Sequence, residues 1–513
     1  MSTSRPFAYN NGSPIVPIPG TIQLGSLAIG TPNDGFASTG LEWWMGPDED
    51  LGYIIARPVP DDSQPTPVSG VTASVAFIRT SALTDVSFIE LVNSYFNQSF
   101  TTVGLCLGWL SVNGYWTSYG AGIFTTTWAT TTPSESITLP YAGVGTYSGT
   151  IDWGDGNTSA NSYGNRTHTY SSPGTYTVVI NGTCTGWNFL DTPDSKLKIK
   201  SVVHWGNLKF GTAYAGLDNG RYFEDCANLD LSSVHDVLDL TVNTNLLHLF
   251  SNCTSLTTIN NINSWNTSAV TNMGYMFSHC TSFNQSLSFD TSSVIQMPGM
   301  FYGCTTFNGS LTFNTPLVTD MNVMFTGCSS FDQPLSFNTS AVTSMHQMFT
   351  GCNVFNSTLT FTSTALVTSM AGMFWQCHAF NQPLSFNTSS VTDMSFMFSE
   401  CYVFNQDISG FNTLAVTNMW KMFYLATAFD QNIGAWNVGN VTDFIDFMSG
   451  KTNATFSTAN LDAIYNGWIA SPKTVQSGIT ISFGSADYTA AGAVGKAYLT
   501  GTKSWTITDG NQV

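Results

Sequence analysis

The sequence predicts a mainly β, multidomain protein whose largest part is a stack of repeated coils. Three observations carry this prediction. An aromatic residue recurs at steps of 24 to 27 residues between positions 223 and 450, strand-like alternation of apolar and polar residues precedes the repeats, and the polar residues are mostly Ser, Thr, Asn and Gly. A chain of 513 residues is long enough for several domains.

The composition excludes some classes of partner. Charged residues make up 9% of the chain and hydrophobic residues 42%, so the low charge does not indicate disorder. The formal net charge is −18, and phosphate binding requires clustered Lys and Arg, so we expect no nucleic-acid partner. The first 20 residues contain no apolar segment of the signal-peptide kind, and no run of about 18 apolar residues predicts membrane insertion.

Residues 1–120 form the first predicted module, which we expect to be β-rich with a short helix over residues 87–95. Its strings FAYNNGSPI, WWMGPDEDLGYIIA and NGYWTSYG resemble structural and fibre proteins of large bacteriophages. The resemblance implies a virion context, in which this module would attach the chain to other virion proteins. It implies no particular chemistry.

Residues 121–185 contain IDWGDG, THTY and SPGTYTVVI in that order. Trp153 and Tyr176 offer large apolar surfaces for a core, and the Asp-Gly and Pro-Gly pairs favour tight turns. The pattern resembles the polycystic-kidney-disease (PKD) type of immunoglobulin-like β-sandwich. Asp152, Asp155 and His168 are of types that occur in catalytic and metal sites, but we expect the Asp residues to accept hydrogen bonds from turn amides and His168 to bond across strands. A calcium site here is left open.

Residues 186–222 are predicted to cap the start of the coils. Apolar residues alternate around Leu197, Ile199 and Val202, which indicates a strand. The open end of a coil stack exposes apolar surface and unpaired backbone, so a covering strand is expected.

The repeats occupy residues 223–450 as about ten coils. The anchor aromatic stands at Phe223, Phe250, Phe277, Phe301, Phe325, Phe349, Phe374, Phe398 and Phe423. Three residues after eight of these anchors comes a cysteine, at Cys226, Cys253, Cys280, Cys304, Cys328, Cys352, Cys377 and Cys401. One cysteine per coil at constant phase predicts a column of buried free thiols. It predicts neither disulfides nor a metal site, since metal ligands must converge on one point.

Two further columns follow the second aromatic of each coil. We expect the first to form a hydrogen-bond ladder of buried side chains that satisfies the backbone at a bend; it comprises Asn284, Asn308, Asp332, Asn356, Asn381, Asn405 and Asp430. The next position varies and is polar, so we expect it to face outward. This candidate ligand-binding column comprises Gln285, Gln333, Ser357, Gln382, Gln406 and Gln431.

The consensus VTxMxxMFxxCxxFNQxLSFNTS closely resembles the BspA-like leucine-rich repeat of bacterial surface proteins, with Phe and Met in place of most Leu and Ile. The resemblance implies a leucine-rich-repeat-type β-solenoid. Residues 451–513 depart from the repeat and resemble the closing segment of the same family. They are predicted to contain helices over 459–468 and 490–499 and a strand near 504–507, and to cover the last coil.

The function predicted from these features is that of a non-enzymatic adhesin without a cofactor. It would be a fibre or surface protein of a bacteriophage virion, made in the host cytoplasm, that binds a host-surface glycan or protein through the repeats. Three alternatives stay open, namely an exported BspA-like adhesin on a bacterial cell surface, a structural decoration protein of a virion, and a polysaccharide depolymerase. A homo-oligomer, for example a trimer, is also left open.

Overall fold

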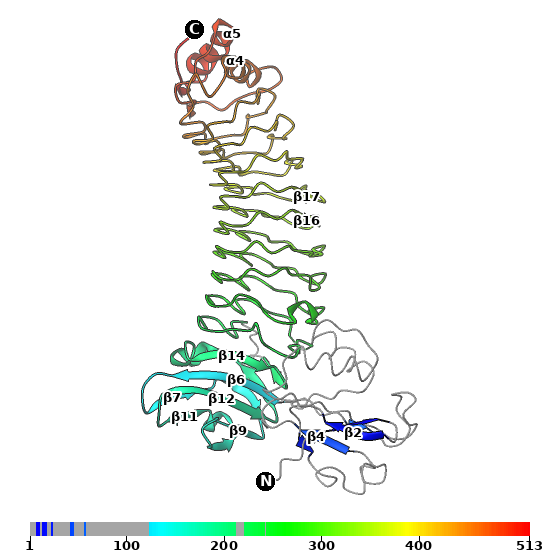
Figure 1. Cartoon of the computed structure of the whole chain (residues 1–513). Helices are drawn as coiled ribbons and strands as arrows, with labels where there is room; N and C mark the ends of the chain where they lie inside the picture. The colour runs from blue at the N-terminus through cyan, green and yellow to red at the C-terminus, as the bar shows by residue number, and fades with distance from the viewer. Residues whose placement is uncertain are drawn as a thin grey trace. The chain divides into compact units, whose positions relative to one another are not determined.

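A computed structural model describes residues 123–211, 220–241 and 243–513, together with the backbone of five short strands near the N-terminus (Figure 1). The chain divides into two compact units, Met1–Ala121 and Gly122–Val513. Strands predominate over helices among the described residues, which confirms the prediction of a mainly β protein.

In the first unit, one antiparallel pair and one three-stranded arrangement are described. The pair joins β1 (Phe7–Asn10) to β2 (Ser13–Pro17), and β4 (Glu42–Met45) lies between β3 (Ile22–Gln23) and β5 (Ala56–Arg57). The helix predicted for residues 87–95 lies outside the described residues.

The second unit begins with a β-sandwich. Its larger sheet has the strand order β10-β9-β12-β6-β14. The members are β6 (Ile123–Thr130), β9 (Thr150–Asp152), β10 (Thr158–Ala160), β12 (Gly174–Asn181) and β14 (Ile199–His204). The remaining strands form the pair β7 (Glu135–Thr138) with β11 (Thr167–Tyr170) and the sheet of β8 (Tyr141–Tyr147), β13 (Cys184–Trp187) and β15 (Leu208–Lys209). Single 3₁₀ turns occupy Tyr163–Asn165, Phe189–Asp191 and Pro193–Ser195.

Aromatic side chains hold these layers together. Trp187 of β13 is fully buried and packs edge-on against Phe124 of β6, with ring centroids 4.7 Å apart. Tyr170 of β11 stacks on Tyr176 of β12 at 3.9 Å. Large rings of this kind bury much apolar area at low entropic cost, so a small sandwich gains a core from few residues.

Strand β14 belongs to the sandwich and also touches the first coil. It pairs antiparallel with β6 of the larger sheet. On its other side, Ser201 forms a parallel bridge with Asp230, and the Asp230 backbone N–H donates to the oxygen of Lys200 at 2.8 Å. The first coil therefore begins on a strand whose backbone is already ordered.

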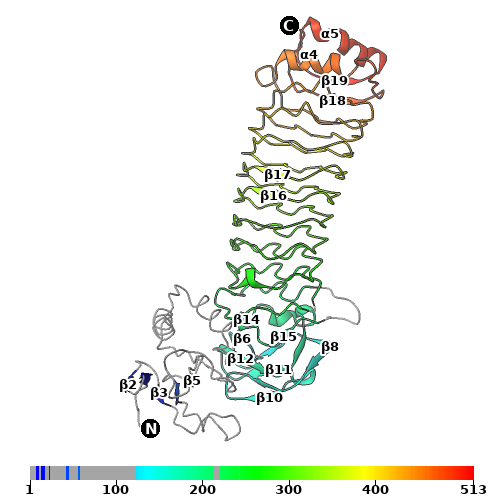
Figure 2. The same ribbon diagram turned by 90° about the vertical axis from the view of Figure 1, so that its right-hand side faces the viewer.

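After β14 the chain forms a stack of coils, which both ribbon views show (Figures 1 and 2). Parallel bridges join equivalent residues of successive coils in one unbroken column. These residues are Asn245, Asn272, Gln296, Asp320, Ser344, Ser369, Asp393, Asn418 and Asp443. On another face, β16 (Leu335–Phe337) pairs parallel with β17 (Leu359–Phe361), and a 3₁₀ turn spans Ile262–Ser264. Each coil is thus hydrogen-bonded to the next, as neighbouring parallel strands are.

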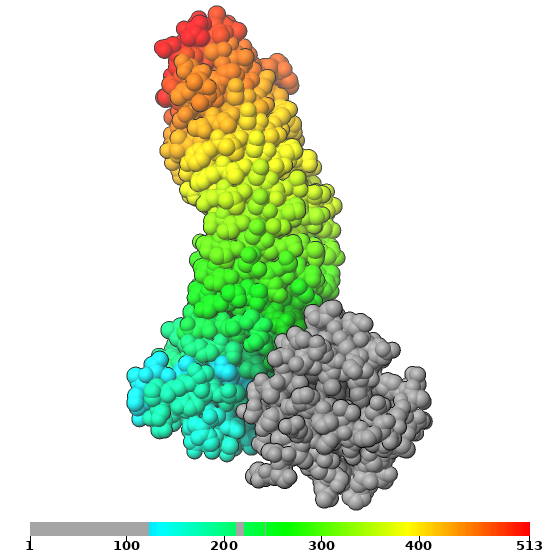
Figure 3. All heavy atoms as spheres, in the orientation of Figure 1, coloured from blue at the N-terminus to red at the C-terminus, as the bar shows by residue number. Residues whose placement is uncertain are grey.

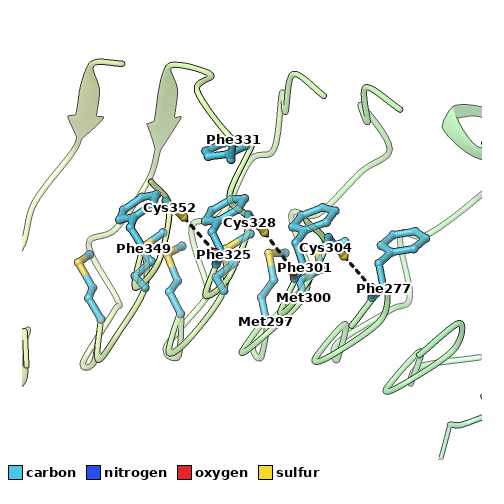
Figure 4. Packing of buried hydrophobic residues seen from close by; sticks show 14 of the residues in the cluster. Phe277, Met297, Met300, Phe301, Cys304, Phe325, Cys328, Phe331, Phe349 and Cys352 are labelled. Atoms are coloured by element: carbon cyan, nitrogen blue, oxygen red, sulfur yellow. Dashed lines mark hydrogen bonds between the residues drawn. The ribbon is translucent and has the colours of Figure 1, made fainter. Parts of the chain in front are cut away.

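Columns of identical side chains fill the interior of the stack. The rings of successive anchor phenylalanines lie 5.5 to 5.9 Å apart from Phe223 to Phe423. The methionines at constant phase, such as Met297 and Met300, are also fully buried (Figure 4). Each coil buries its ring against the rings above and below, so the stack has one continuous core.

The last residues close the upper end of the stack. Both predicted helices are present, as α4 (Thr458–Gly467) and α5 (Ala490–Ala497), and a π-helical turn at Tyr498–Thr502 follows α5. The predicted strand is present as β19 (Thr506–Thr508). Strand β18 (Thr480–Ser482) pairs with β19 and bridges to Phe444 of the last coil. The ring of Trp468 packs against Phe444 at 5.4 Å. Among the described residues, no helix has the length and apolar character that a membrane span needs.

Candidate functional site

The eight repeat cysteines form a column inside the stack. All eight are free and fully buried. From Cys253 onward, each thiol donates a hydrogen bond to the backbone oxygen of the anchor phenylalanine one coil earlier, at 2.8 to 3.1 Å (Figure 4). Burial raises the pKa of these thiols well above its ordinary value, for example at Cys328. A protonated, buried thiol is neither a nucleophile nor a metal ligand, so this column is structural.

The conspicuous residues of the sandwich also make structural contacts. His168 Nε2 lies 2.8 Å from Asp155 Oδ2, and the His168 ring stacks on Trp153. Burial acts to raise the pKa of Asp155, but hydrogen bonds with His168 and Asn157 outweigh it and lower that pKa. Tyr176 donates its hydroxyl to the backbone oxygen of Ser172. Across the parts of the chain that the structure describes, no three His, Cys, Asp or Glu side chains gather as a metal site would require.

The Asn/Asp column forms a ladder on the surface. The side-chain oxygen at each rung accepts a hydrogen bond from the backbone N–H at the same position one coil later, as from Asn381 to Asn356 at 2.9 Å. The ladder runs without a break from Asn284 to Asp430, and Asp430 then accepts from the N–H of Ser457. The predicted ladder is therefore present. The expectation that its side chains are buried was wrong, because they are exposed or half-buried.

The neighbouring column, predicted to face outward for a ligand, is tied to the same ladder. Gln382 and Gln333 donate to the Asn side chain of the preceding coil, and Gln406 and Gln431 donate to both the side chain and the backbone oxygen there. Ser357 donates to the backbone oxygen of Asp332, and Gln285 exchanges two hydrogen bonds with the backbone of Ile259. All six side chains are half-buried. Their hydrogen-bonding groups are partly used between coils, which leaves less of them for a ligand.

A different part of the surface departs from the repeat. Three successive coils, anchored at Phe374, Phe398 and Phe423, carry aromatic side chains at positions on the outside of the stack. We call the residues Trp375, Phe396, Trp420, Lys421 and Tyr424 the aromatic patch. The ring centroids of Trp375 and Phe396 lie 5.1 Å apart, and those of Phe396 and Trp420 lie 4.7 Å apart at 67°.

The cation of the aromatic patch lies among its rings. Lys421 Nζ is 5.0 Å from the ring centroid of Tyr424, 5.5 Å from that of Trp420 and 5.9 Å from that of Phe396. Trp420 keeps 38% of its surface exposed, and the other members are half-buried. A cation near several ring faces is held electrostatically, so the patch has a defined arrangement.

Sequence reasoning missed the aromatic patch, although a signal was present. At the position of Trp420, preceding coils carry Gly274, Pro298, Asn322, His346, Ala371 and Ser395. At the position of Trp375 they carry Ser278, Tyr302, Thr326 and Thr350. A search for large residues at variable positions, rather than for constant columns, would have found it.

Comparison with known families concerns the repeats. A family model described as "Mycoplasma protein of unknown function, DUF285" matches the chain three times, over residues 221–312, 244–362 and 355–460. No curated protein and no solved structure matches the chain. The matched residues coincide with the stack of coils, and the family is one of repeat-containing surface proteins related to the BspA-like proteins.

Proposed function

We propose that this chain is a non-enzymatic adhesin of a bacteriophage virion, which binds a host-surface ligand through its repeat region. In this proposal the repeats form a leucine-rich-repeat-type solenoid, the sandwich is of the PKD type and acts as a spacer, and residues 1–120 attach the chain to the particle. The resemblance of the N-terminal strings to phage fibre proteins motivates the virion part.

One observation carries the binding function. The interior columns of the stack hardly change from coil to coil, whereas outward positions change freely and gather four aromatic side chains at one place. A scaffold of constant shape with a locally varied surface is what repeat proteins use for recognition. A contiguous apolar surface in water is typical of an interaction site. The coils form one continuous column of surface, coloured green to orange (Figure 3).

Binding to whole cells tests the adhesin. Labelled full-length protein is incubated with a panel of bacterial strains that includes hosts of the source phage, and bound protein is measured by flow cytometry. We expect saturable binding to susceptible strains, which an excess of unlabelled protein displaces. Equal, non-saturable retention by susceptible and resistant strains would contradict the proposal.

The family match favours one alternative location, since that family is named from Mycoplasma proteins and comprises surface proteins. In this second candidate function the same adhesin lies on a bacterial cell surface. Immunogold labelling with antibodies against the chain separates the two locations. Gold on purified virions supports the first, and gold on the envelope of uninfected cells supports the second.

A further inference from the structure

Two residues of the aromatic patch stand in a column of left-handed backbone that recurs from coil to coil. Phe396 and Lys421 have φ angles of 55° and 53°, in the left-handed region. At the same column, the coils anchored at Phe301 and Phe374 carry Gly299 and Gly372 with similar angles. Other coils place Arg221, His248, Tyr275, Val323, Gln347 and Asp446 there, so the left-handed backbone belongs to the repeat and this column accepts large side chains.

A second left-handed column supplies polar groups next to the rings. Gln376 and Glu400 have φ angles of 61° and 59°, where three earlier coils carry glycine at residues 303, 327 and 351. Glu400 accepts a hydrogen bond from the indole nitrogen of Trp375 at 3.3 Å and another from the Gln376 amide at 3.4 Å. The carboxylate is half-buried and lies beside the indole ring. The patch therefore combines ring surface with fixed acceptors and donors.

The charges around the patch limit the class of ligand. Lys421 is its one cation, and the carboxylate of Asp446 lies 3.9 Å from the Lys421 ammonium. With Glu400 also present, an anionic polymer would meet more negative than positive charge, and the whole chain carries −18. A cationic ligand would have to compete with Lys421, whose ammonium already lies by the ring faces that would hold it. A purely apolar ligand would displace water from the half-buried Glu400 carboxylate and Lys421 ammonium without replacing its hydrogen bonds.

A neutral sugar matches these features. A pyranose ring presents a face of C–H groups, which carry slight positive charge and pack on the negative face of an aromatic ring. Its edge carries hydroxyls, each of which both donates and accepts, so one ligand can serve the Glu400 carboxylate and the Lys421 ammonium together. Binding sites for small ligands commonly combine aromatic walls with a few polar groups in this way.

We propose that the aromatic patch is a binding site for neutral, pyranose-containing glycans, with Trp420 as the stacking platform and Glu400 and Lys421 as hydrogen-bonding partners of the hydroxyls. This inference rests on the proposed adhesin function and deepens it by naming the ligand class and the site. It places recognition on the three coils of residues 374–424 rather than on the Gln/Ser column.

Titration with oligosaccharides tests the site. Full-length protein is titrated with neutral oligosaccharides of glucose, galactose, mannose and N-acetylglucosamine while tryptophan fluorescence is recorded, with saturation-transfer NMR as a second readout. We expect saturable binding of at least one of them, weakened at least about tenfold in Trp420→Ala and less in Trp420→Phe. Glu400→Gln and Lys421→Met are expected to weaken binding as well.

Tyr163→Ala is the matched control. Tyr163 of the sandwich is 43% exposed and also carries a cation over its ring, with Arg166 Cζ 3.7 Å from the centroid, but it lies outside the coils. We expect its affinity to equal that of the unmodified protein. Circular dichroism and thermal unfolding show whether each variant is folded. If no oligosaccharide binds at concentrations up to about 10 mM, or if Trp420→Ala binds as well as Tyr163→Ala, the inference is overturned.

Cell binding separates this inference from the adhesin itself. If Trp420→Ala still adheres to susceptible cells with full affinity, the patch is not the recognition site but the adhesin proposal stands. If adhesion depends on Trp420 yet survives periodate oxidation of the cells and is lost after protease treatment, the ligand is a protein and the inference is wrong. If an acidic glycan such as hyaluronate binds more tightly than the neutral oligosaccharides, the charge argument fails.

Discussion

The thiol of Cys328 donates a hydrogen bond to the backbone oxygen of Phe301, 3.0 Å away in the preceding coil. The same oxygen also accepts the backbone N–H of Cys304. One carbonyl thus serves a turn within its own coil and a link to the next. The thiol is fully buried and joins two successive coils through this carbonyl.

Replacing Cys328 by alanine should lower stability modestly. The variant loses a buried sulfur and one weak hydrogen bond, but the Phe301 oxygen keeps its other partner, so we expect a loss of about 1–2 kcal/mol. Alanine already stands at this phase at Ala426, which shows that the column accepts it. Urea unfolding measures the change, with the exposed residue Ser330→Ala as control. A loss above about 4 kcal/mol would contradict this account.

The repeat thiols should be unreactive in the native protein. Only a thiolate is alkylated, and burial raises the pKa of every repeat thiol, so neither ionisation nor access is available near pH 8. We expect mass spectrometry to find iodoacetamide on these cysteines only after unfolding in urea. Rapid labelling of any of the eight without denaturant would show that its coil opens.

The ladder of Asn and Asp side chains predicts different effects on stability for two substitutions of Asn356. Asn356 Oδ1 accepts the backbone N–H of Asn381 and the side-chain amide of Gln382. Asn356→Ala removes both bonds and should cost about 1 kcal/mol. Asn356→Asp keeps the acceptor and should be close to neutral, because Asp332 makes the same bond naturally. The midpoints of urea unfolding measure the stability of the two variants. Equal losses of stability would show that the hydrogen bonds accepted by Asn356 do not stabilise the fold.

Much of the core could be predicted because the same residue types recur at the same positions in many successive coils. Eight cysteines at one offset from an anchor phenylalanine leave few alternatives to a buried column, and the structure buries Cys226 through Cys401. The helices at the C-terminus were also predictable, since their apolar residues follow ordinary local patterns. Such features depend on residues close in sequence or on strict periodicity.

The aromatic patch and the hydrogen bonds of the Gln column could not be predicted from the sequence. Both depend on which side chains of successive coils lie close together, and the repeat period does not give that. Phe396 meets Trp420 and Trp375 only because coils of 24 or 25 residues bring unlike positions together. Gln406 looked free in the consensus, yet its amide reaches back to Asn381. A polar, variable position can therefore be structural, and an aromatic one can be exposed. The sequence alone does not distinguish these cases.

Lys451 ends the cysteine column. It stands at the same phase as the cysteines, 25 residues after Ala426, and only 2% of its surface is exposed. Its ammonium donates to the backbone oxygens of Ala426, Phe429, Thr427 and Thr455. These four carbonyls lie at the end of the repeats, where no further coil supplies a thiol. The lysine thus replaces a missing coil as their hydrogen-bond donor.

Stability should rise with pH because of Lys451. Burial lowers its pKa from 10.5 to about 7 in the folded chain, although the charge of Asp430 acts to raise it. Between these values the unfolded chain binds the extra proton, so the free energy of unfolding increases with pH, by at most about 1.4 kcal/mol per unit. Below about pH 7 both states are protonated and this contribution is flat. Urea unfolding of the unmodified protein and of Lys451→Met, from about pH 6 to about pH 10, isolates the effect. We expect their difference in stability to shift in favour of the unmodified protein above about pH 7, and parallel curves would show that Lys451 does not titrate in this range.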